Sequence, residues 1–243
     1  MIRQGKDSLR LPLMNFRVID IFYTAQSRLP QSRILSKLQV LNLCNNQINN
    51  IKASVFTNLP NLASLYLKYN RITNIHTDTF SNLPKLTKLS LTGNQITYIH
   101  PGIFSNLPQL KTLCLDQNNI IEILPGAFSD LERLGTLYLE KNQITKINLN
   151  TVSNLPHLGN LYLDYNKITE IDPRAFSNLP QLLRLRLDSN QISALPLSAY
   201  KMLASIPNVW LSNNPWQCDC RMAPFRLSKN GSRSLENQIL VLS

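Results

Sequence analysis

The chain has 243 residues, of which 43% are hydrophobic and only seven are glycine, a composition that is ordinary for a globular protein. No run approaches the ~20 apolar residues that cross a bilayer, so the sequence predicts no transmembrane segment. The net charge of +11 is concentrated at the ends, because residues 1–37 carry seven basic and two acidic groups whereas residues 38–214 carry fourteen and ten. A chain without a basic working surface is not expected to bind nucleic acid.

Residues 1–37 are predicted to form a degenerate N-terminal cap that contains no cysteine. They do not hold the pattern L-x-x-L-x-L that recurs every 24 residues from Leu38. A shift back by 24 residues places Met14, Arg17 and Ile19 at its leucine positions, which is a poor match. Arg17 and Asp20 also interrupt the apolar core that a signal peptide would need, so a signal peptide is not clearly present.

An eleven-residue frame, L-x-x-L-x-L-x-x-N-x-I, recurs every 24 residues from Leu38 and is clearest in 158–168, LGNLYLDYNKI. Its asparagines are Asn46, Asn70, Asn94, Asn118, Asn142, Asn166, Asn190 and Asn214. The period-two leucines predict a strand buried on one face, over Val40–Cys44 and every 24 residues on. This pattern predicts an α/β repeat fold, a leucine-rich repeat solenoid. It is expected to be a right-handed curved coil with a concave parallel sheet and an irregular convex side.

The predicted organisation is the cap over 1–37, seven repeats over 38–205, and a last degenerate repeat with a truncated C-terminal cap over 206–243. The eight coils begin at Leu38, Leu62, Leu86, Leu110, Leu134, Leu158, Leu182 and Ile206. We expect the asparagines to be structural, because a buried amide can satisfy backbone groups of its own and the adjacent coil.

Two features mark the convex side of each coil. One is an apolar column that is aromatic except at Val152: Phe56, Phe80, Phe104, Phe128, Val152, Phe176 and Tyr200. The other is a recurrent N-L-P, as in 178–180, whose proline suits an irregular connector rather than a long helix.

The four cysteines predict neither a disulfide within this chain nor a metal site. Cys44 and Cys114 lie three coils apart, which at sheet spacing is ~14 Å and too far to bridge. Cys218 and Cys220 are too close in sequence to pair readily, and no cysteine follows them. Zinc needs four ligands, which this C-x-C pair does not supply. No cofactor is expected either.

The 24-residue repeat, its phenylalanine, its N-L-P and the closing NPWQCDC resemble the extracellular leucine-rich repeat proteins, among them Toll-like receptors, Slit proteins and the Nogo receptor. Over residues 38–220 the chain is most similar to the variable lymphocyte receptors of jawless vertebrates and related receptor-like proteins of chordates. The resemblance implies an extracellular or cell-surface location and a ligand on the concave face or the C-terminal cap. In that cap Trp216 would pack under the last coil, and Cys218 and Cys220 would pair with two later cysteines. Because no later cysteine follows, we expect a truncated gene model.

The outward strand positions differ from coil to coil while the frame is held, as on a recognition surface. Tyrosine, tryptophan and arginine dominate binding hot spots, and here they gather in coils five to eight. The candidate ligand-binding residues are Tyr138, Glu140, Tyr162, Asp164, Tyr165, Arg184, Arg186, Asp188 and Trp210. Four acidic side chains follow one another at this face: Asp116, Glu140, Asp164 and Asp188. They form either a solvated row eased by Lys141, Arg184 and Arg186, or a row that meets a cationic ligand.

The three histidines do not suggest catalysis, because His76, His100 and His157 fall where they cannot reach these carboxylates. The sequence therefore predicts a non-catalytic, immune-receptor-like protein that binds a protein or a microbial glycan, with its oligomeric state left open. The alternative is a cell-surface adhesion or guidance-type interaction module. A purely structural module would instead show a contiguous apolar patch.

Overall fold

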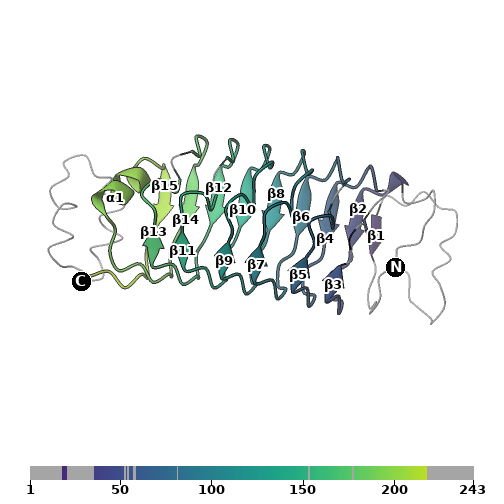
Figure 1. Ribbon diagram of the computed structural model, residues 1–243, viewed down its shortest axis with the longest axis horizontal. Helices are drawn as coiled ribbons and strands as arrows, with labels where there is room; N and C mark the ends of the chain where they lie inside the picture. The colour runs from purple at the N-terminus through teal and green to yellow at the C-terminus, as the bar shows by residue number, and fades with distance from the viewer. Residues whose placement is uncertain are drawn as a thin grey trace.

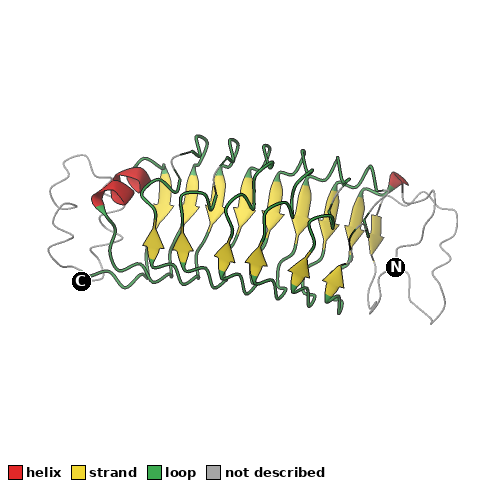
Figure 2. Ribbon diagram, viewed as in Figure 1, coloured by secondary structure: helices red, strands yellow, loops and turns green. Residues whose placement is uncertain are grey.

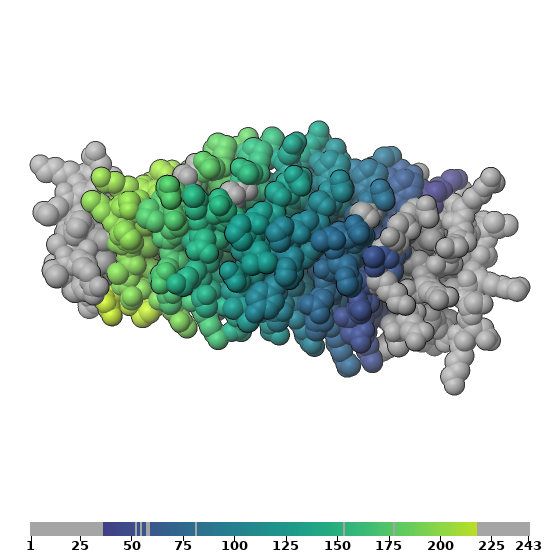
Figure 3. Space-filling view, in the orientation of Figure 1, coloured from purple at the N-terminus to yellow at the C-terminus, as the bar shows by residue number. Residues whose placement is uncertain are grey.

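The computed structural model describes residues 18–20, 36–51, 53, 55–56, 59–80, 82–152, 154–176 and 178–217. The chain winds into an elongated solenoid whose coils follow one another in sequence order along the long axis (Figures 1 and 3). The predicted leucine-rich repeat solenoid is therefore confirmed.

One parallel sheet of nine strands runs the length of the described solenoid, in the order β1-β2-β4-β6-β8-β10-β12-β14-β15. The strands are β1 (Val18–Asp20), β2 (Val40–Asn42), β4 (Ser64–Tyr66), β6 (Lys88–Ser90), β8 (Thr112–Cys114), β10 (Thr136–Tyr138), β12 (Asn160–Tyr162), β14 (Arg184–Arg186) and β15 (Asn208–Trp210). Within coils one to eight each strand pairs with the next at an offset of 24 residues, so equivalent side chains stand side by side. The sheet thus converts a sequence repeat into straight columns of side chains.

The strands are shorter than predicted, because β2 ends at Asn42 rather than at Cys44. Backbone hydrogen bonds to the next coil continue beyond the strand: the Leu43 N–H donates to the Tyr66 carbonyl at 2.8 Å, and the Asn45 N–H to that of Lys68 at 2.9 Å. Asn45 has a φ of +57° and turns the chain out of the pleat. The residue before every motif asparagine shares this left-handed conformation: Asn45, Tyr69, Gly93, Gln117, Lys141, Tyr165, Ser189 and Asn213.

Strand β1 is a feature that the 24-residue frame missed. Ile19 pairs with Leu41 in a parallel register, at an offset of 22 residues rather than 24. At the shorter offset Phe16, Ile19 and Ile21 of the sequence fall on the leucine positions of the frame. The apolar spacing of the motif is therefore present before Leu38, two residues out of phase.

A second line of two-residue strands lies across the coil from the main sheet (Figure 2). They form three two-stranded parallel sheets, β3–β5, β7–β9 and β11–β13. Their bounds are β3 Asn50–Ile51, β5 Asn74–Ile75, β7 Tyr98–Ile99, β9 Glu122–Ile123, β11 Lys146–Ile147 and β13 Glu170–Ile171. Each contributes one buried isoleucine, and together with the buried leucines of the main sheet these form one continuous core.

The asparagines form a buried row, the asparagine row, that binds each coil to its predecessor. Asn142 Nδ2 donates to the carbonyls of Leu115 and Leu139, both at 3.0 Å. Its Oδ1 accepts the N–H of Ile120 at 3.0 Å. The same contacts recur at Asn70, Asn94, Asn118, Asn166, Asn190 and Asn214. Each amide therefore bonds through both its nitrogen and its oxygen to buried backbone groups, and carbonyls such as that of Leu139 accept from two successive asparagines.

On the convex side, four phenylalanine rings stack between neighbouring coils at centroid distances of 6.0–6.2 Å, from Phe56 to Phe128. Val152 follows and is fully buried, so the coil closes there around a smaller side chain. Three N-L-P asparagines, Asn82, Asn106 and Asn154, and Asp130 in the same position of coil four have φ between +61° and +70°. Asparagine and aspartate tolerate this conformation better than other non-glycine residues, which explains why these types recur there.

Coil seven departs from the irregular convex side that was predicted, because it forms helix α1 (Leu197–Ala204). In the 24-residue frame, Met202 and Ala204 replace the asparagine and proline of N-L-P. Without a left-handed residue or a missing N–H, the helical hydrogen bonds continue. The chain then reaches β15 and Trp216, which packs against the core and donates from Nε1 to the Leu211 carbonyl at 3.2 Å.

Candidate functional site

The outward side of the nine-stranded sheet, here called the sheet face, carries the candidate binding residues. Strand register places Tyr138 of β10 directly beside Tyr162 of β12. Their rings stack with centroids 4.8 Å apart and planes 5° apart, and both side chains are partly exposed. The next two positions of this column are Arg186, also partly exposed, and Trp210, which is 37% exposed. The column thus offers rigid aromatic area with a charged group beside it.

The neighbouring column is the acidic row, composed of Asp116, Glu140, Asp164 and Asp188. The three aspartates are only 5–8% exposed, so the interpretation of the row as a solvated face does not hold for them. Glu140 is intermediate in burial. Desolvated carboxylates this close in one column repel one another unless donors or cations compensate them.

The two ends of the acidic row have such compensation. At one end Thr92 Oγ1 donates to Asp116 Oδ1 at 2.8 Å, and Ser90 Oγ lies 3.2 Å from the same threonine oxygen. At the other end the guanidinium of Arg186 binds both oxygens of Asp188, Nε to Oδ1 at 3.0 Å and Nη2 to Oδ2 at 2.8 Å. Thr92 and Ser90 were not among the predicted site residues. Thr92 occupies the position 24 residues before Asp116, which is the signal that could have identified it.

The middle of the acidic row is less compensated than its ends. Glu140 Oε2 and Asp164 Oδ1 are buried and have no hydrogen-bond partner among the described residues. The nearest cation is Arg186, whose Nη2 lies 3.7 Å from Asp164 Oδ2. Of the other two predicted cations, the charge of Lys141 lowers the pKa of Asp164, but neither Lys141 nor Arg184 forms an ion pair with the described carboxylates of the row. Lys141 Nζ lies 5.9 Å from the centroid of the Tyr165 ring, and Arg184 Nη1 donates to Asn160 Oδ1 at 3.1 Å.

This environment changes the ionisation of the site. Burial, with further contributions from the charges of Asp116 and Asp164, raises the pKa of Glu140 from 4.5 to about 7. Burial also raises the pKa of Asp164, against the lowering effect of Arg186. Burial raises the pKa of the Tyr138 hydroxyl as well. Near neutral pH the middle of the row therefore holds Glu140 in a mixture of its neutral and charged forms.

The predicted site residues lie on adjacent strands and in the turns that follow them. Tyr138, Tyr162, Glu140 and Asp164 form a contiguous group on β10, β12 and the turns that follow them. Tyr165, which is 53% exposed, lies in the left-handed turn after this group. The remaining candidates lie in the next two coils: Arg184, Arg186 and Asp188 in coil seven and Trp210 in coil eight.

The comparison with protein families agrees with this geometry. A family model described as leucine rich repeat matches residues 36–96, 84–144 and 133–192. Together these matches cover well over half of the 243 residues. The chain belongs to the leucine-rich repeat family. Leucine-rich repeat domains are typical protein-binding modules and are generally non-catalytic scaffolds. A search of curated proteins finds no match to the chain.

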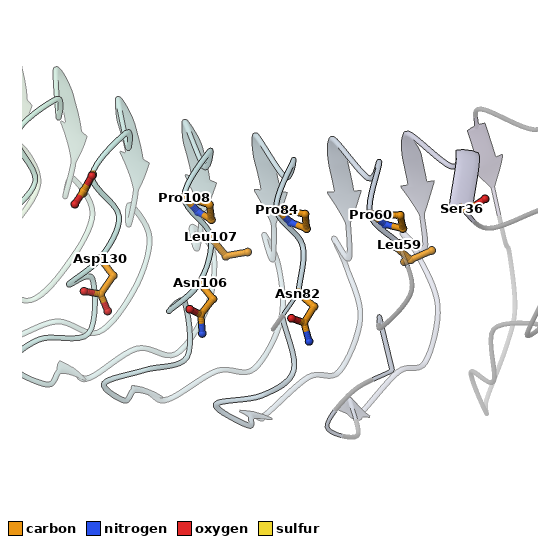
Figure 4. A pocket seen from close by; sticks show the side chains of 10 residues that line it. Ser36, Leu59, Pro60, Asn82, Pro84, Asn106, Leu107, Pro108 and Asp130 are labelled. Atoms are coloured by element: carbon orange, nitrogen blue, oxygen red, sulfur yellow. The ribbon is translucent and has the colours of Figure 1, made fainter. Parts of the chain in front are cut away.

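The leucine-rich repeat solenoid also has a groove away from the sheet face (Figure 4). It encloses about 810 Å³ along the N-L-P connectors of the first three coils and the equivalent segment 130–132 of coil four, and it is lined by residues such as Pro60, Pro84 and Pro108. None of the candidate binding residues lines it. Because it follows the repeat rather than a particular set of side chains, we do not place the site there.

The part of this leucine-rich repeat chain that is described contains no cluster of three or more histidine, cysteine, aspartate or glutamate side chains arranged to hold a metal ion. Among the same residues, no helix has the length and hydrophobicity that crossing a bilayer requires. Cys44 and Cys114 belong to coils one and four and are not joined by a disulfide. Cys218 and Cys220 lie outside the described residues.

Proposed function

We propose that this leucine-rich repeat protein is a non-catalytic recognition protein that binds a macromolecular ligand on its sheet face at coils five to eight. The observation that carries the proposal is the stacked, partly exposed pair of Tyr138 and Tyr162, flanked by the carboxylates of Glu140 and Asp164. Paired aromatic side chains provide contact area at low entropic cost, and the polar groups around them provide specificity.

The candidate set for this surface is the one predicted from the sequence: Tyr138, Glu140, Tyr162, Asp164, Tyr165, Arg184, Arg186, Asp188 and Trp210. We infer that the protein acts outside the cell or at its surface in an immune-receptor-like role, on the strength of its resemblance to extracellular leucine-rich repeat receptors. A protein is the favoured ligand and a microbial glycan the other, since the family is a protein-binding one. An adhesion or guidance role would use the same face with a host protein as partner.

The test is a binding screen against bacterial cell-wall preparations and host surface proteins, followed by variants of the sheet face. Truncation of an anchoring tyrosine typically costs 2 kcal/mol or more. We expect a Tyr138→Ala/Tyr162→Ala variant to weaken binding at least ~30-fold, at about 1.4 kcal/mol per decade. Lys68→Ala, a change on the same face in coil two, is the control and should weaken binding less than ~3-fold. A control variant that loses more affinity than the tyrosine variant would place the site elsewhere.

A further inference from the structure

Arg186 shows what a cation does when it lies on the acidic row. It projects from the aromatic column of coil seven and contacts two successive carboxylates, Asp188 of its own coil and Asp164 of the coil before. The contact with Asp188 is bidentate, the geometry in which a planar guanidinium binds a carboxylate most strongly. The solenoid thus already contains one guanidinium bridging a step of this row.

The preceding step has the same strand register, with a tyrosine in place of the cation. A shift back by 24 residues places Tyr162 at the position of Arg186, with Asp164 and Glu140 in the places of Asp188 and Asp164. These two carboxylates hold the buried oxygens without a hydrogen-bond donor, and Asp164 is only 5% exposed. A buried acceptor without a donor destabilises the fold, so a ligand that supplies the missing donor removes that cost when it binds.

We propose that this open step between Glu140 and Asp164 binds the guanidinium of an arginine side chain presented by a protein partner. The proposal rests on the proposed function, because it assigns the ligand chemistry of the same face. The rings of Tyr138 and Tyr162 stand in the adjacent column, where a planar cation can pack against aromatic surface.

The local charges fit such a ligand although the whole chain is basic. The excess of positive charge lies mainly at the ends of the sequence, outside coils five and six. Lys141 lies over the Tyr165 ring, and Arg186 is held by Asp188. Because the two unpartnered oxygens are buried, the carboxylates must rotate about their terminal torsions, which are broad, to face a ligand.

The test uses the full chain with ¹³C-labelled aspartate and glutamate side chains, observed by NMR at pH 8. The probe is N-acetyl-arginine methylamide, and its matched control is the citrulline analogue, which has nearly the same shape and no charge. We expect saturable shifts of the Glu140 and Asp164 carboxyl signals with the arginine probe, and affinity at least ~10-fold weaker for citrulline. Equal affinity for the two probes, or no saturable shift, would overturn the proposal.

Three variants test whether the NMR shifts arise from arginine bound between Glu140 and Asp164. Glu140→Gln should weaken arginine binding at least ~10-fold, whereas Glu122→Gln, which changes an exposed carboxylate in β9, should leave it unchanged. Tyr162→Arg should supply an internal guanidinium and prevent probe binding, and its folding is verified by near-UV circular dichroism. If Glu140→Gln is poorly folded, Asp164→Asn replaces it; wild-type affinity in whichever of the two folds would refute the site.

The outcome separates this inference from the proposed function. If the tyrosine double variant abolishes binding of a macromolecular ligand but the arginine probe does not bind, the surface is correct and the ligand chemistry is wrong. If the arginine probe binds as expected but the double variant retains every macromolecular ligand, the inferred step exists and the proposed binding surface fails.

Discussion

The asparagine row and the acidic row are two columns of polar side chains built by the same 24-residue repeat, two residues apart in each coil. Asn142 is satisfied because an amide has both donors and an acceptor, so it bonds backward to Leu115 and accepts from Ile120. Glu140, in the acidic row, can only accept when it is ionised, and its Oε2 has no donor among the described residues. Repetition therefore stabilises one row and destabilises the other.

The two rows differ in how their hydrogen bonds are supplied. The asparagine row is uniform across coils and serves the fold, whereas the acidic row is compensated at Asp116 and Asp188 by side chains particular to their coils. Buried polar groups left without partners are rare in native structures, so those in the middle of the acidic row call for an explanation. Three substitutions would break or sharpen this contrast.

The largest expected effect is on the asparagine row. Asn142→Ala removes the acceptor of the buried Ile120 N–H and one of the two asparagine donors to each of two carbonyls, so we expect a loss of about 2–3 kcal/mol in the free energy of unfolding. Urea denaturation measures it. Asn119→Ala, an exposed asparagine one coil earlier, is the control and should change stability by less than about 0.5 kcal/mol. Equal effects of the two variants would contradict the structural role of the row.

A smaller change in the free energy of unfolding, and an increase rather than a loss, is expected when Glu140 is replaced. Its pKa is raised to about 7 in the folded state from 4.5, so the folded state binds more protons and wild-type stability falls as pH rises through this interval. Glu140→Gln cannot ionise and should be the more stable protein at pH 8. The full shift corresponds to about 3 kcal/mol, and solvent screening of a partly exposed group reduces the expected gain to about 1–2 kcal/mol.

The measurement is the free energy of unfolding from pH 4 to pH 8 for both proteins. The stability of Glu140→Gln relative to the wild type should be near zero at pH 4 and should increase between pH 4.5 and 8. Glu122→Gln is the control and should give a curve parallel to that of the wild type. A Glu140→Gln protein that is less stable at pH 8 would show that the carboxylate is compensated after all.

The smallest effect is expected at the compensated end of the acidic row. Thr92→Val keeps the shape of the side chain but removes the hydroxyl that donates to Asp116, so stability should fall by about 1 kcal/mol. Thr145→Val, at an exposed position, should change it by less than about 0.5 kcal/mol in the same denaturation experiment. If Thr92→Val is as stable as the wild type, the contrast between the end and the middle of the row is wrong.

The solenoid could be predicted from the sequence because its determinants are periodic. Leucines at period two and an asparagine every 24 residues specify strand, turn and coil without reference to distant contacts. Strand β1 was missed because it keeps the apolar spacing at a different offset. Helix α1 was missed because its cause is the loss of N-L-P at Met202 and Ala204, an absence within one coil rather than a repeated signal.

The candidate site could be predicted only in part. The positions of its tyrosines and carboxylates could be predicted, because each occupies the same place in successive 24-residue repeats. The hydrogen bonds between neighbouring columns could not, because they depend on side-chain geometry in three dimensions. The sequence suggested Lys141 and Arg184 as compensating charges, whereas Lys141 lies at Tyr165 and Arg184 at Asn160. Long flexible side chains of this kind have several reachable partners, and the pattern alone does not choose among them.

The partners of the asparagine row have a consequence for how the gene can change. Each asparagine bonds to the backbone of residues that every coil possesses, at separations of 22 and 27 positions along the chain. Duplication or loss of a 24-residue unit would therefore leave the hydrogen bonding of the remaining coils intact, because each asparagine would meet an equivalent neighbour. Recombination in whole units can thus lengthen or shorten the sheet face without new stabilising mutations. Insertions of other lengths would have to be absorbed in the convex connectors.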